Sequence, residues 1–202
     1  MTGIKVNDDN FQSRAEQSRA EQSRAEWIDF ARGIAIASVI VGHYIFNLLG
    51  VLIFAFHIPL FCVISGILAK PNNLKISIRK VVSKTMPYYC YTAVIICLIS
   101  ILIMHVNPIF DWLLGMNNST TYFNVVYGIG PMWYLLAYII ASIISSQLIR
   151  INDSTKSFLL SCVLCLIGVM ISRMLILPYQ IDNGLVLTVF ICFGYCVKQK
   201  DL

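Results

Sequence analysis

Long apolar runs dominate the pattern of this chain. They cover about residues 31–49, 51–69, 86–105, 131–149, 157–177 and 181–197. Each of the first five approaches the roughly 20 residues that a helix needs to cross the hydrocarbon core of a bilayer, and the sixth has 17. The pattern therefore predicts an all-α protein, a polytopic transmembrane bundle of about six spanning helices, with a long loop at about 106–130.

The composition strengthens the membrane prediction. Of the 202 residues, 58% are apolar and only 12% are charged, whereas an ordinary soluble domain carries about 25% charged residues. A chain of this length has no room for a sizeable soluble domain beside a membrane domain. The seven cysteines all fall in or beside apolar runs, which predicts packing and neither a disulfide framework nor a metal site.

Lys and Arg residues fall on alternate loops and so indicate how the helices are oriented. Fourteen of the fifteen belong to the amino-terminal segment, the loop 70–84, the connection at 150–156 and the carboxyl end, and the other is Arg173 in the fifth run. Because loops rich in Lys and Arg tend to stay in the cytoplasm, the amino terminus and the loop 70–84 are predicted to be cytoplasmic. This topology accounts for the net charge of +5 and requires no nucleic-acid partner.

The segment before the first apolar run is repetitive. Residues 12–26 read Gln-Ser-Arg-Ala-Glu three times without an error. Its polar composition predicts that residues 1–26 form a solvated cytoplasmic tail, separate from a transmembrane domain over 27–202. A five-nucleotide unit, CAGAG, encodes this pentapeptide when it is repeated in frame. We expect gain or loss of one unit to switch expression, a form of phase variation typical of bacterial surface-modifying genes.

Arg32 and His43 are the first candidates for chemistry. They lie eleven positions apart in a run that otherwise holds no charge. Eleven residues are about three helical turns, so both side chains lie on one face, roughly 16 Å apart along the axis. Ionisable groups at membrane depth are costly and usually face a protein interior or a water-filled cavity. Arg32 is expected at the cytoplasmic edge and His43 in the outer half of the helix.

His57 lies near the outer end of the second run, and it can lie at the same depth in the membrane as His43. One interpretation is that its ring hydrogen-bonds a backbone carbonyl and orders helix packing. The other is that it acts as a general base for a hydroxyl, because the pKa of an imidazole lies near neutrality. Pro59 indicates a kink or a helix start, and Ser65 and Gly66 indicate a close approach of helices.

Three further sites allow two interpretations each. The basic stretch with Arg79 and Lys84 either anchors the topology and meets anionic lipid heads, or binds a phosphate-bearing donor such as a coenzyme A thioester. Trp133 either belongs to an interfacial aromatic belt or stacks on a sugar acceptor. Arg173 either snorkels to the interface or faces the core as a partner for a substrate anion.

Four of these blocks, in this order and with this topology, resemble the membrane acyltransferase-3 family, which O-acetylates bacterial surface polysaccharides and lipopolysaccharide. The matching blocks are Arg32 with His43, 56–61 with Ser65 and Gly66, the basic stretch ending at 86–88, and 131–135. The resemblance implies an enzyme of the bacterial inner membrane that needs no metal. It would transfer acetyl from acetyl-CoA to a hydroxyl of a cell-surface sugar or lipopolysaccharide, with membrane lipids and a carbohydrate or lipid-linked sugar acceptor as partners.

The resemblance also implies roles for single residues. His43 matches the family's essential histidine and would serve as the base, and Arg32 matches the cation paired with it. Arg79 and Lys84 fall in the donor-binding stretch, although the two arginines separated by two residues that the family often has there are absent. His57 and Trp133 match conserved blocks and are expected to contact substrate.

The family usually has more spanning helices than the six expected in this chain. This difference predicts a fragment, a truncated product, or a short form that works with a partner. Two other functions stay open. One is a small transporter or channel in which Arg and His line a path, and binding of coenzyme A would exclude it. The other is an inert assembly subunit or remnant, which the complete gene sequence would identify.

Overall fold

The computed structural model describes residues 26–42, 48–105, 109–115, 129, 132–151, 153–175 and 177–200. The chain divides into two compact units, residues 1–61 and 62–202, and the boundary falls inside helix α2 (Leu48–Ile67). Every element in the described ranges is helical and none of their residues lies in a strand. The prediction of an all-α protein is therefore confirmed.

The described part of the first unit contains two apolar helices. Residues 26–42 form one of them, and the part of α2 before the unit boundary forms the other. Large apolar side chains of the first helix, among them Phe30, Ile36 and Ile40, are exposed. A helix with apolar residues on its outer face is suited to a membrane or to burial in a larger core.

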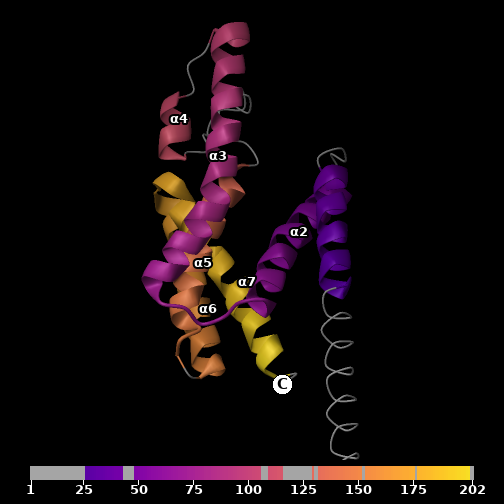
Figure 1. Ribbon diagram of the computed structural model, residues 1–202, viewed down its shortest axis with the longest axis vertical. Helices are drawn as coiled ribbons and strands as arrows, with labels where there is room; N and C mark the ends of the chain where they lie inside the picture. The colour runs from indigo at the N-terminus through magenta and orange to yellow at the C-terminus, as the bar shows by residue number, and fades with distance from the viewer. Residues whose placement is uncertain are drawn as a thin grey trace, which may run out of the picture. The chain divides into compact units, whose positions relative to one another are not determined.

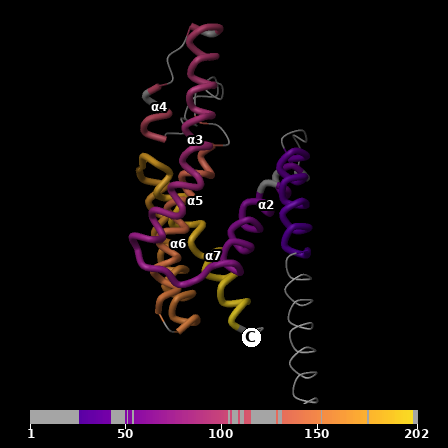
Figure 2. The backbone as a smooth tube through the Cα atoms, viewed as in Figure 1, coloured from indigo at the N-terminus to yellow at the C-terminus, as the bar shows by residue number. Residues whose placement is uncertain are grey.

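The second unit is a helical bundle (Figures 1 and 2). Helix α7 packs against both α5 and α6, and α3 packs against α5. The elements are α3 (Leu74–Met104), α4 (Ile109–Leu114), α5 (Trp133–Leu148), α6 (Ser154–Met174), the 3₁₀ turn η2 (Pro178–Gln180) and α7 (Ile181–Lys200). Short connections follow α5 and α6, so these helices alternate in direction.

Among the residues that the structure describes, three helical segments are long and apolar enough to cross a membrane. They are Leu74–Ile103, Ser154–Met174 and Pro178–Gln199. Two shorter apolar helices, Ala55–Ile67 and Trp133–Leu148, accompany them. These segments point to a membrane protein, and the number of about six spanning helices stays a prediction.

The loop predicted at 70–84 is wrong over most of its length, because α3 begins at Leu74. Its basic residues occupy the first turns of the helix. Lys and Arg are strong helix formers, and no Gly or Pro interrupts the chain from Leu74 to Thr85. The helix has 31 residues, or about 46 Å, which exceeds the roughly 30 Å of a bilayer core. The basic turns at its start can therefore lie outside the hydrocarbon core of a bilayer while the apolar remainder crosses it.

The expected loop at 106–130 contains the short helix α4, which the hydrophobic pattern did not predict. Six residues are too few for a stable helix in isolation, so contacts with other elements must hold it. The Tyr89 hydroxyl donates to the carbonyl oxygen of Trp112 at 2.6 Å. The Gln180 side-chain amide donates to the carbonyl oxygen of Gly115 at 2.9 Å. Gly115 has a φ of 60°, which glycine adopts without steric strain.

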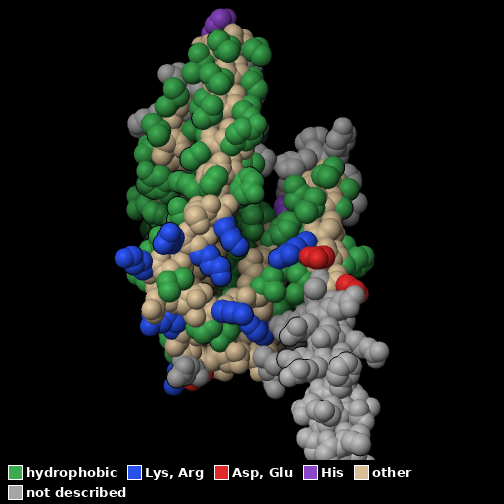
Figure 3. All heavy atoms as spheres, viewed as in Figure 1, with side chains coloured by type: hydrophobic (Ala, Val, Ile, Leu, Met, Phe, Trp, Pro, Cys, Tyr) green, Lys and Arg blue, Asp and Glu red, His purple; other side chains and the backbone are tan. Residues whose placement is uncertain are grey.

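Basic residues gather at one end of the second unit. The stretch 75–84 opens α3, Arg150 follows α5, Lys156 lies in the first turn of α6, and Lys198 lies near the end of α7. The Lys198 ammonium donates to the carbonyl oxygen of Ala69 at 3.0 Å. Figure 3 shows Lys and Arg side chains over the lower part of this unit and apolar side chains over its upper part. The charge is one-sided, as predicted, and which side is cytoplasmic stays a prediction.

Candidate functional site

His57 is buried on helix α2 of the first unit. Its Nδ1 lies 2.9 Å from the carbonyl oxygen of Ile53, one turn earlier. Because a carbonyl can only accept, Nδ1 carries the hydrogen, and the neutral ring then has its lone pair on Nε2. The backbone hydrogen bond that the sequence suggested is present. It holds the ring in one orientation.

Pro59 lies inside α2, two residues after His57. Proline has no N–H to donate to the carbonyl of Ala55 four residues earlier, and its ring crowds that carbonyl. The helix nevertheless continues to Ile67. The alternative of a helix start at Pro59 is therefore wrong, and Pro59 is a local irregularity two residues from the histidine.

Arg32 forms an ion pair with Asp29, one turn earlier on the same helix. Its Nη1 lies 3.2 Å from the Asp29 Oδ1, and the two side chains are 46% and 73% exposed. An exposed pair of this kind stabilises a helix by at most about 1 kcal/mol. Asp29 was missed as a partner, although its spacing of three residues was an available signal. His43 lies outside the described residues, so its place on the face of Arg32 stays a prediction.

The basic residues of α3 form two adjacent stripes. Lys75 and Arg79 are four residues apart, as are Lys80 and Lys84, so each pair shares a face of the helix. All four side chains are exposed. No ion pair found among the described residues includes any of them. The candidate donor residues Arg79 and Lys84 thus belong to neighbouring stripes of one exposed cationic surface.

Trp133 opens α5 and is half-buried. Its ring meets Tyr134 edge-on, with ring centroids 6.4 Å apart. It also packs against a buried cluster that includes Tyr89 and Trp112. Because these residues come from α3 and α4, Trp133 lies beside the second half of α3 and is covered by protein on part of its surface.

A side-chain hydrogen bond joins α2 to α5 within the second unit. The Tyr138 hydroxyl donates to the Ser65 hydroxyl at 3.1 Å. The ring of Tyr138 also lies beside that of Tyr134, with ring centroids 5.8 Å apart. Ser65 was predicted only to allow a close approach of helices, and its bond to Tyr138 was not predicted.

Arg173 lies in the last turn of α6, and its side chain is exposed. A cation at this position is favoured by the partial negative charge of a helix carboxyl end. The exposure fits the interpretation that Arg173 snorkels. Its role in binding a substrate anion stays a prediction.

The structure brings some predicted site residues to one end of the second unit and separates others. The start of α5, with Trp133, packs against the second half of α3, so the two helices run in opposite directions (Figure 1). Arg79 and Lys84 in the first half of α3 therefore lie toward the opposite end from Trp133. Arg173, at the end of α6, lies toward the Trp133 end. Arg32 belongs to the first unit.

The described part of the chain contains no cluster of three or more His, Cys, Asp or Glu residues that could hold a metal ion. All seven cysteines are free thiols. Cys62 and Cys192 have no exposed surface, as expected of residues that serve packing.

Comparison with known proteins identifies a family. The family model of an acyltransferase domain, that of the acyltransferase-3 family, matches residues 25–202. The matched region includes every candidate site residue and all four blocks that carry the resemblance. No curated protein and no solved structure matches the chain.

Proposed function

The chain belongs to the acyltransferase-3 family, and we propose that it is an O-acyltransferase of the bacterial inner membrane. Its reaction is the transfer of acetyl from acetyl-CoA to a hydroxyl of a cell-surface sugar or lipopolysaccharide. The observation that carries this proposal is the family match over residues 25–202. In the proposed orientation the amino terminus and the basic end of the bundle face the cytoplasm, where acetyl-CoA is found.

The two stripes of cations at the start of α3 support a donor site there. Lys75, Arg79, Lys80 and Lys84 are exposed and concentrated within three turns. Charge-assisted hydrogen bonds from Lys and Arg to phosphate are among the stronger polar contacts in proteins. The phosphates of coenzyme A would bind to this surface. Anionic lipid heads are competitors for the same charges.

The proposed chemistry is attack of the acceptor hydroxyl oxygen on the thioester carbonyl carbon. The new C–O bond forms, the C–S bond breaks, and the hydroxyl proton passes through an imidazole to the leaving thiolate of coenzyme A. His43 is the proposed base, by its match to the family's essential histidine. General base catalysis of this kind contributes typically 10²–10⁴-fold to a rate.

His57 is the proposed second imidazole at the substrate. Its ring is held by the bond from Nδ1 to the carbonyl of Ile53. A ring held in one orientation suits a residue that positions a substrate. His57 would thus orient the acceptor, while His43 takes its proton.

Arg32 is the cation proposed to stabilise negative charge on the donor or in the transition state. Its guanidinium is paired with Asp29, so the net charge that it offers to a phosphate or an oxyanion is reduced. The pair is exposed, and exchange of Asp29 for a phosphate ligand costs little because the surface ion pair is weak. Within the second unit, at the end away from the basic stripes of α3, Trp133 would stack on the acceptor sugar and Arg173 would bind an acidic group of it.

The expression of the gene is proposed to be phase-variable. The support is the threefold exact repeat over residues 12–26, which tandem CAGAG units would encode. Sequencing of the gene tests this proposal directly. Uninterrupted CAGAG units, varying in number between isolates, are expected, and scattered synonymous codons would contradict the proposal.

The experiment that tests the enzymatic proposal uses the full chain in lipid vesicles. Isotope-labelled acetyl-CoA is supplied with de-O-acetylated envelope polysaccharide, and acetate on the polysaccharide is measured. His43→Ala is expected to lose activity by at least about 100-fold. His105→Ala is the matched control, because His105 caps the far end of α3 and has no proposed role. Unchanged acetylation in His43→Ala at normal protein level would remove His43 from the mechanism. A wild-type chain that neither binds acetyl-CoA nor acetylates the polysaccharide would contradict the proposal.

A further inference from the structure

The stripe of Lys80 and Lys84 on α3 continues along the helix as an exposed face. The residues of this face are spaced three, four or seven apart, which places them on one side of a helix. They are Lys80, Lys84, Tyr88, Tyr91, Ile95 and Leu102, and all six are exposed. We call this side of α3 the lysine–tyrosine face.

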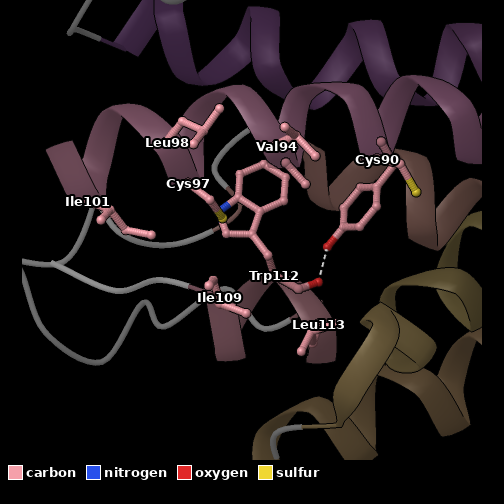
Figure 4. A pocket seen from close by; sticks show the side chains of 10 residues that line it. Cys90, Val94, Cys97, Leu98, Ile101, Ile109, Trp112 and Leu113 are labelled. Atoms are coloured by element: carbon pink, nitrogen blue, oxygen red, sulfur yellow. Dashed lines mark hydrogen bonds between the residues drawn. The ribbon is translucent and has the colours of Figure 1, made fainter.

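The neighbouring basic stripe leads to a different side of the helix. Met86 and Ala93 follow Arg79 at intervals of seven residues, so they lie on nearly the same side as Arg79. Both pack against the buried cluster around Tyr89. The Tyr89 hydroxyl donates to the carbonyl oxygen of Trp112 in α4, so this side of α3 is covered by protein (Figure 4). Only the stripe of Lys80 and Lys84 continues onto the lysine–tyrosine face.

The sequence of α3 indicates where a bilayer would meet this face. Residues 86–104 include no charged side chain, and a helix of this length spans about 28 Å, close to the roughly 30 Å of a hydrocarbon core. Most of the helix belongs to a segment long and apolar enough to cross a membrane. Lys80 and Lys84 then lie at the level of the lipid head groups. Tyr88 and Tyr91 lie just inside the core, and Leu102 lies deep within it.

The polar side chains of the lysine–tyrosine face need partners from outside the protein. Within the described part of the chain, the side chains of Lys80, Lys84, Tyr88 and Tyr91 form no hydrogen bond or ion pair. Tyr88 and Tyr91 are 70% and 71% exposed. A hydroxyl group in hydrocarbon without a hydrogen-bond partner is costly. The face therefore favours a neighbour that has negative charge beside the lysines and oxygen acceptors beside the tyrosines.

We propose that the lysine–tyrosine face binds an anionic phospholipid. The phosphate accepts hydrogen bonds from the ammonium groups of Lys80 and Lys84, and the ester carbonyls accept from the hydroxyls of Tyr88 and Tyr91. One acyl chain lies along the apolar remainder of the face. These groups follow one another in the lipid in the same order as their partners in α3. The proposal goes beyond acetyl transfer and requires only that α3 crosses a membrane.

The continuation of the face favours a lipid over a soluble phosphate ligand. Lys84 is also a candidate donor residue, and the phosphates of coenzyme A carry the same kind of charge as a lipid phosphate. The residues that follow Lys84 on this face are two tyrosines and then apolar side chains, which suit esters and a hydrocarbon chain. A lipid bound there leaves Arg79, on the other stripe, to the donor.

The test measures lipid binding to the purified full chain in detergent by native mass spectrometry. Two lipids with the same oleoyl chains are titrated. Phosphatidylglycerol has a net negative charge, whereas phosphatidylcholine has none. One Lys beside an anionic lipid contributes about fivefold to affinity, so wild type is expected to bind phosphatidylglycerol at least about fivefold more tightly. Equal affinities for the two lipids would overturn the proposal.

Two double variants identify the surface that selects the lipid. Lys80→Gln with Lys84→Gln is expected to bind both lipids equally. Lys75→Gln with Arg79→Gln is the matched control, because it removes the same charge from the other stripe of the same helix, and it should keep the preference of wild type. Equal loss of preference in both double variants would overturn the proposal, since the lipid would then respond to net charge and not to this face.

The tyrosine hydroxyls are tested separately from the charge. Tyr88→Phe with Tyr91→Phe keeps both rings and removes both donors. It is expected to weaken the binding of both lipids by at least about twofold, since a hydrogen bond contributes about that factor or more. Unchanged affinity for both lipids would overturn the proposed contact with the esters.

A competition experiment separates a lipid from a soluble phosphate ligand. Glycerol 3-phosphate has the charged group of the lipid without its chains, and in large excess it is expected to leave phosphatidylglycerol bound. Displacement would overturn the proposal and assign the lysines to a soluble ligand such as the donor. Elution of each variant as a single species in size-exclusion chromatography confirms folding. Lys80→Gln, compared with Lys75→Gln, replaces the double variants should these aggregate.

Discussion

Gly66 of α2 and Gly194 of α7 form a reciprocal close contact between two helix backbones. A Cβ added to Gly66 would overlap the backbone of Ile191, and a Cβ added to Gly194 would overlap the backbone of Val63. Small residues allow this approach, which is typical of helix interfaces in membranes. The last turns of α2 are thus joined to α7 because two side chains are absent, and the predicted role of Gly66 is confirmed.

We expect Gly66→Ala and Gly194→Ala to destabilise the protein by about 1–3 kcal/mol each, since either methyl group forces the helices apart. Gly33→Ala is the matched control, because nothing lies within 4 Å of its added Cβ. That substitution should be neutral or stabilising by up to about 1 kcal/mol, since glycine is a poor helix former. Thermal unfolding in detergent measures all three. Equal melting temperatures for the three variants would contradict the close contact.

The hydrogen bond from Tyr138 to Ser65 should couple the two helices energetically. In a double-mutant cycle with Tyr138→Phe and Ser65→Ala we expect a coupling of about 0.6 kcal/mol, and at most about 1.7 kcal/mol, as for other hydrogen bonds between membrane helices. Ser172→Ala combined with Tyr138→Phe is the control, because the Ser172 hydroxyl donates to Val169 within its own helix. A coupling of zero between Tyr138 and Ser65 would show that their bond does not stabilise the fold.

The apolar runs located the later helices well. The run at 131–149 corresponds to α5, 157–177 to α6, and 181–197 to α7, each within a few residues at either end. The pattern wrongly predicted a loop at 70–84, because hydrophobicity indicates which residues avoid water and not which backbone conformation they adopt. It also could not find α4, whose anchors Tyr89 and Gln180 lie 23 and 65 residues away from the carbonyls that they bind.

The candidate site was predictable where its contacts are local. The bond from His57 to Ile53 spans one helical turn, and so does the ion pair of Arg32 with Asp29. The bond between Tyr138 and Ser65 spans 73 residues and depends on how two helices cross. How two helices cross cannot be predicted from a single sequence.

The stability of the fold should depend on pH through Asp153, the residue that precedes α6. Its carboxylate accepts hydrogen bonds from the backbone N–H groups of Lys156 and Thr155 at 3.1 and 3.0 Å, and it lies 3.2 Å from the Lys156 ammonium. These contacts hold the pKa of Asp153 below its ordinary value of 3.8. The backbone hydrogen bond from Lys156 contributes most to this lowering. A lowered pKa means that the charged carboxylate stabilises the folded state above the ordinary pKa. That stabilisation is lost as the pH falls through the lowered value.

We therefore expect the melting temperature of wild type to fall more than that of Asp153→Asn between about pH 5 and pH 3. Asn retains the capping oxygen but has no proton to gain. Asp153→Ala should melt at a lower temperature than wild type at neutral pH, because the cap is lost. Melting is followed in detergent at each pH. Parallel curves for wild type and Asp153→Asn would contradict the contribution of this carboxylate.

The cationic surface of α3 should affect the binding of acetyl-CoA and not the chemical step that follows. We expect Arg79→Ala and Lys84→Ala each to raise the KM for acetyl-CoA by roughly three- to tenfold with little change in kcat, since a phosphate contact is equal in the ground and transition states. The effect should diminish at high salt, because exposed charges are screened. Lys156→Ala is the control, because Lys156 opens α6 and is paired with Asp153. An unchanged KM in both α3 variants would remove these residues from the donor site.

The pairing of Arg32 with Asp29 leads to the last prediction, which concerns the charge that Arg32 offers to the donor. Asp29→Asn removes the competing carboxylate and should tighten acetyl-CoA binding by roughly two- to fivefold, with a change in stability below about 1 kcal/mol. Equilibrium binding to the purified chain measures the affinity. The same substitution in an Arg32→Ala background should have no effect, because the cation that Asp29 neutralises is then absent. Equal tightening in both backgrounds would show that Asp29 repels the donor on its own and that Arg32 does not contact it.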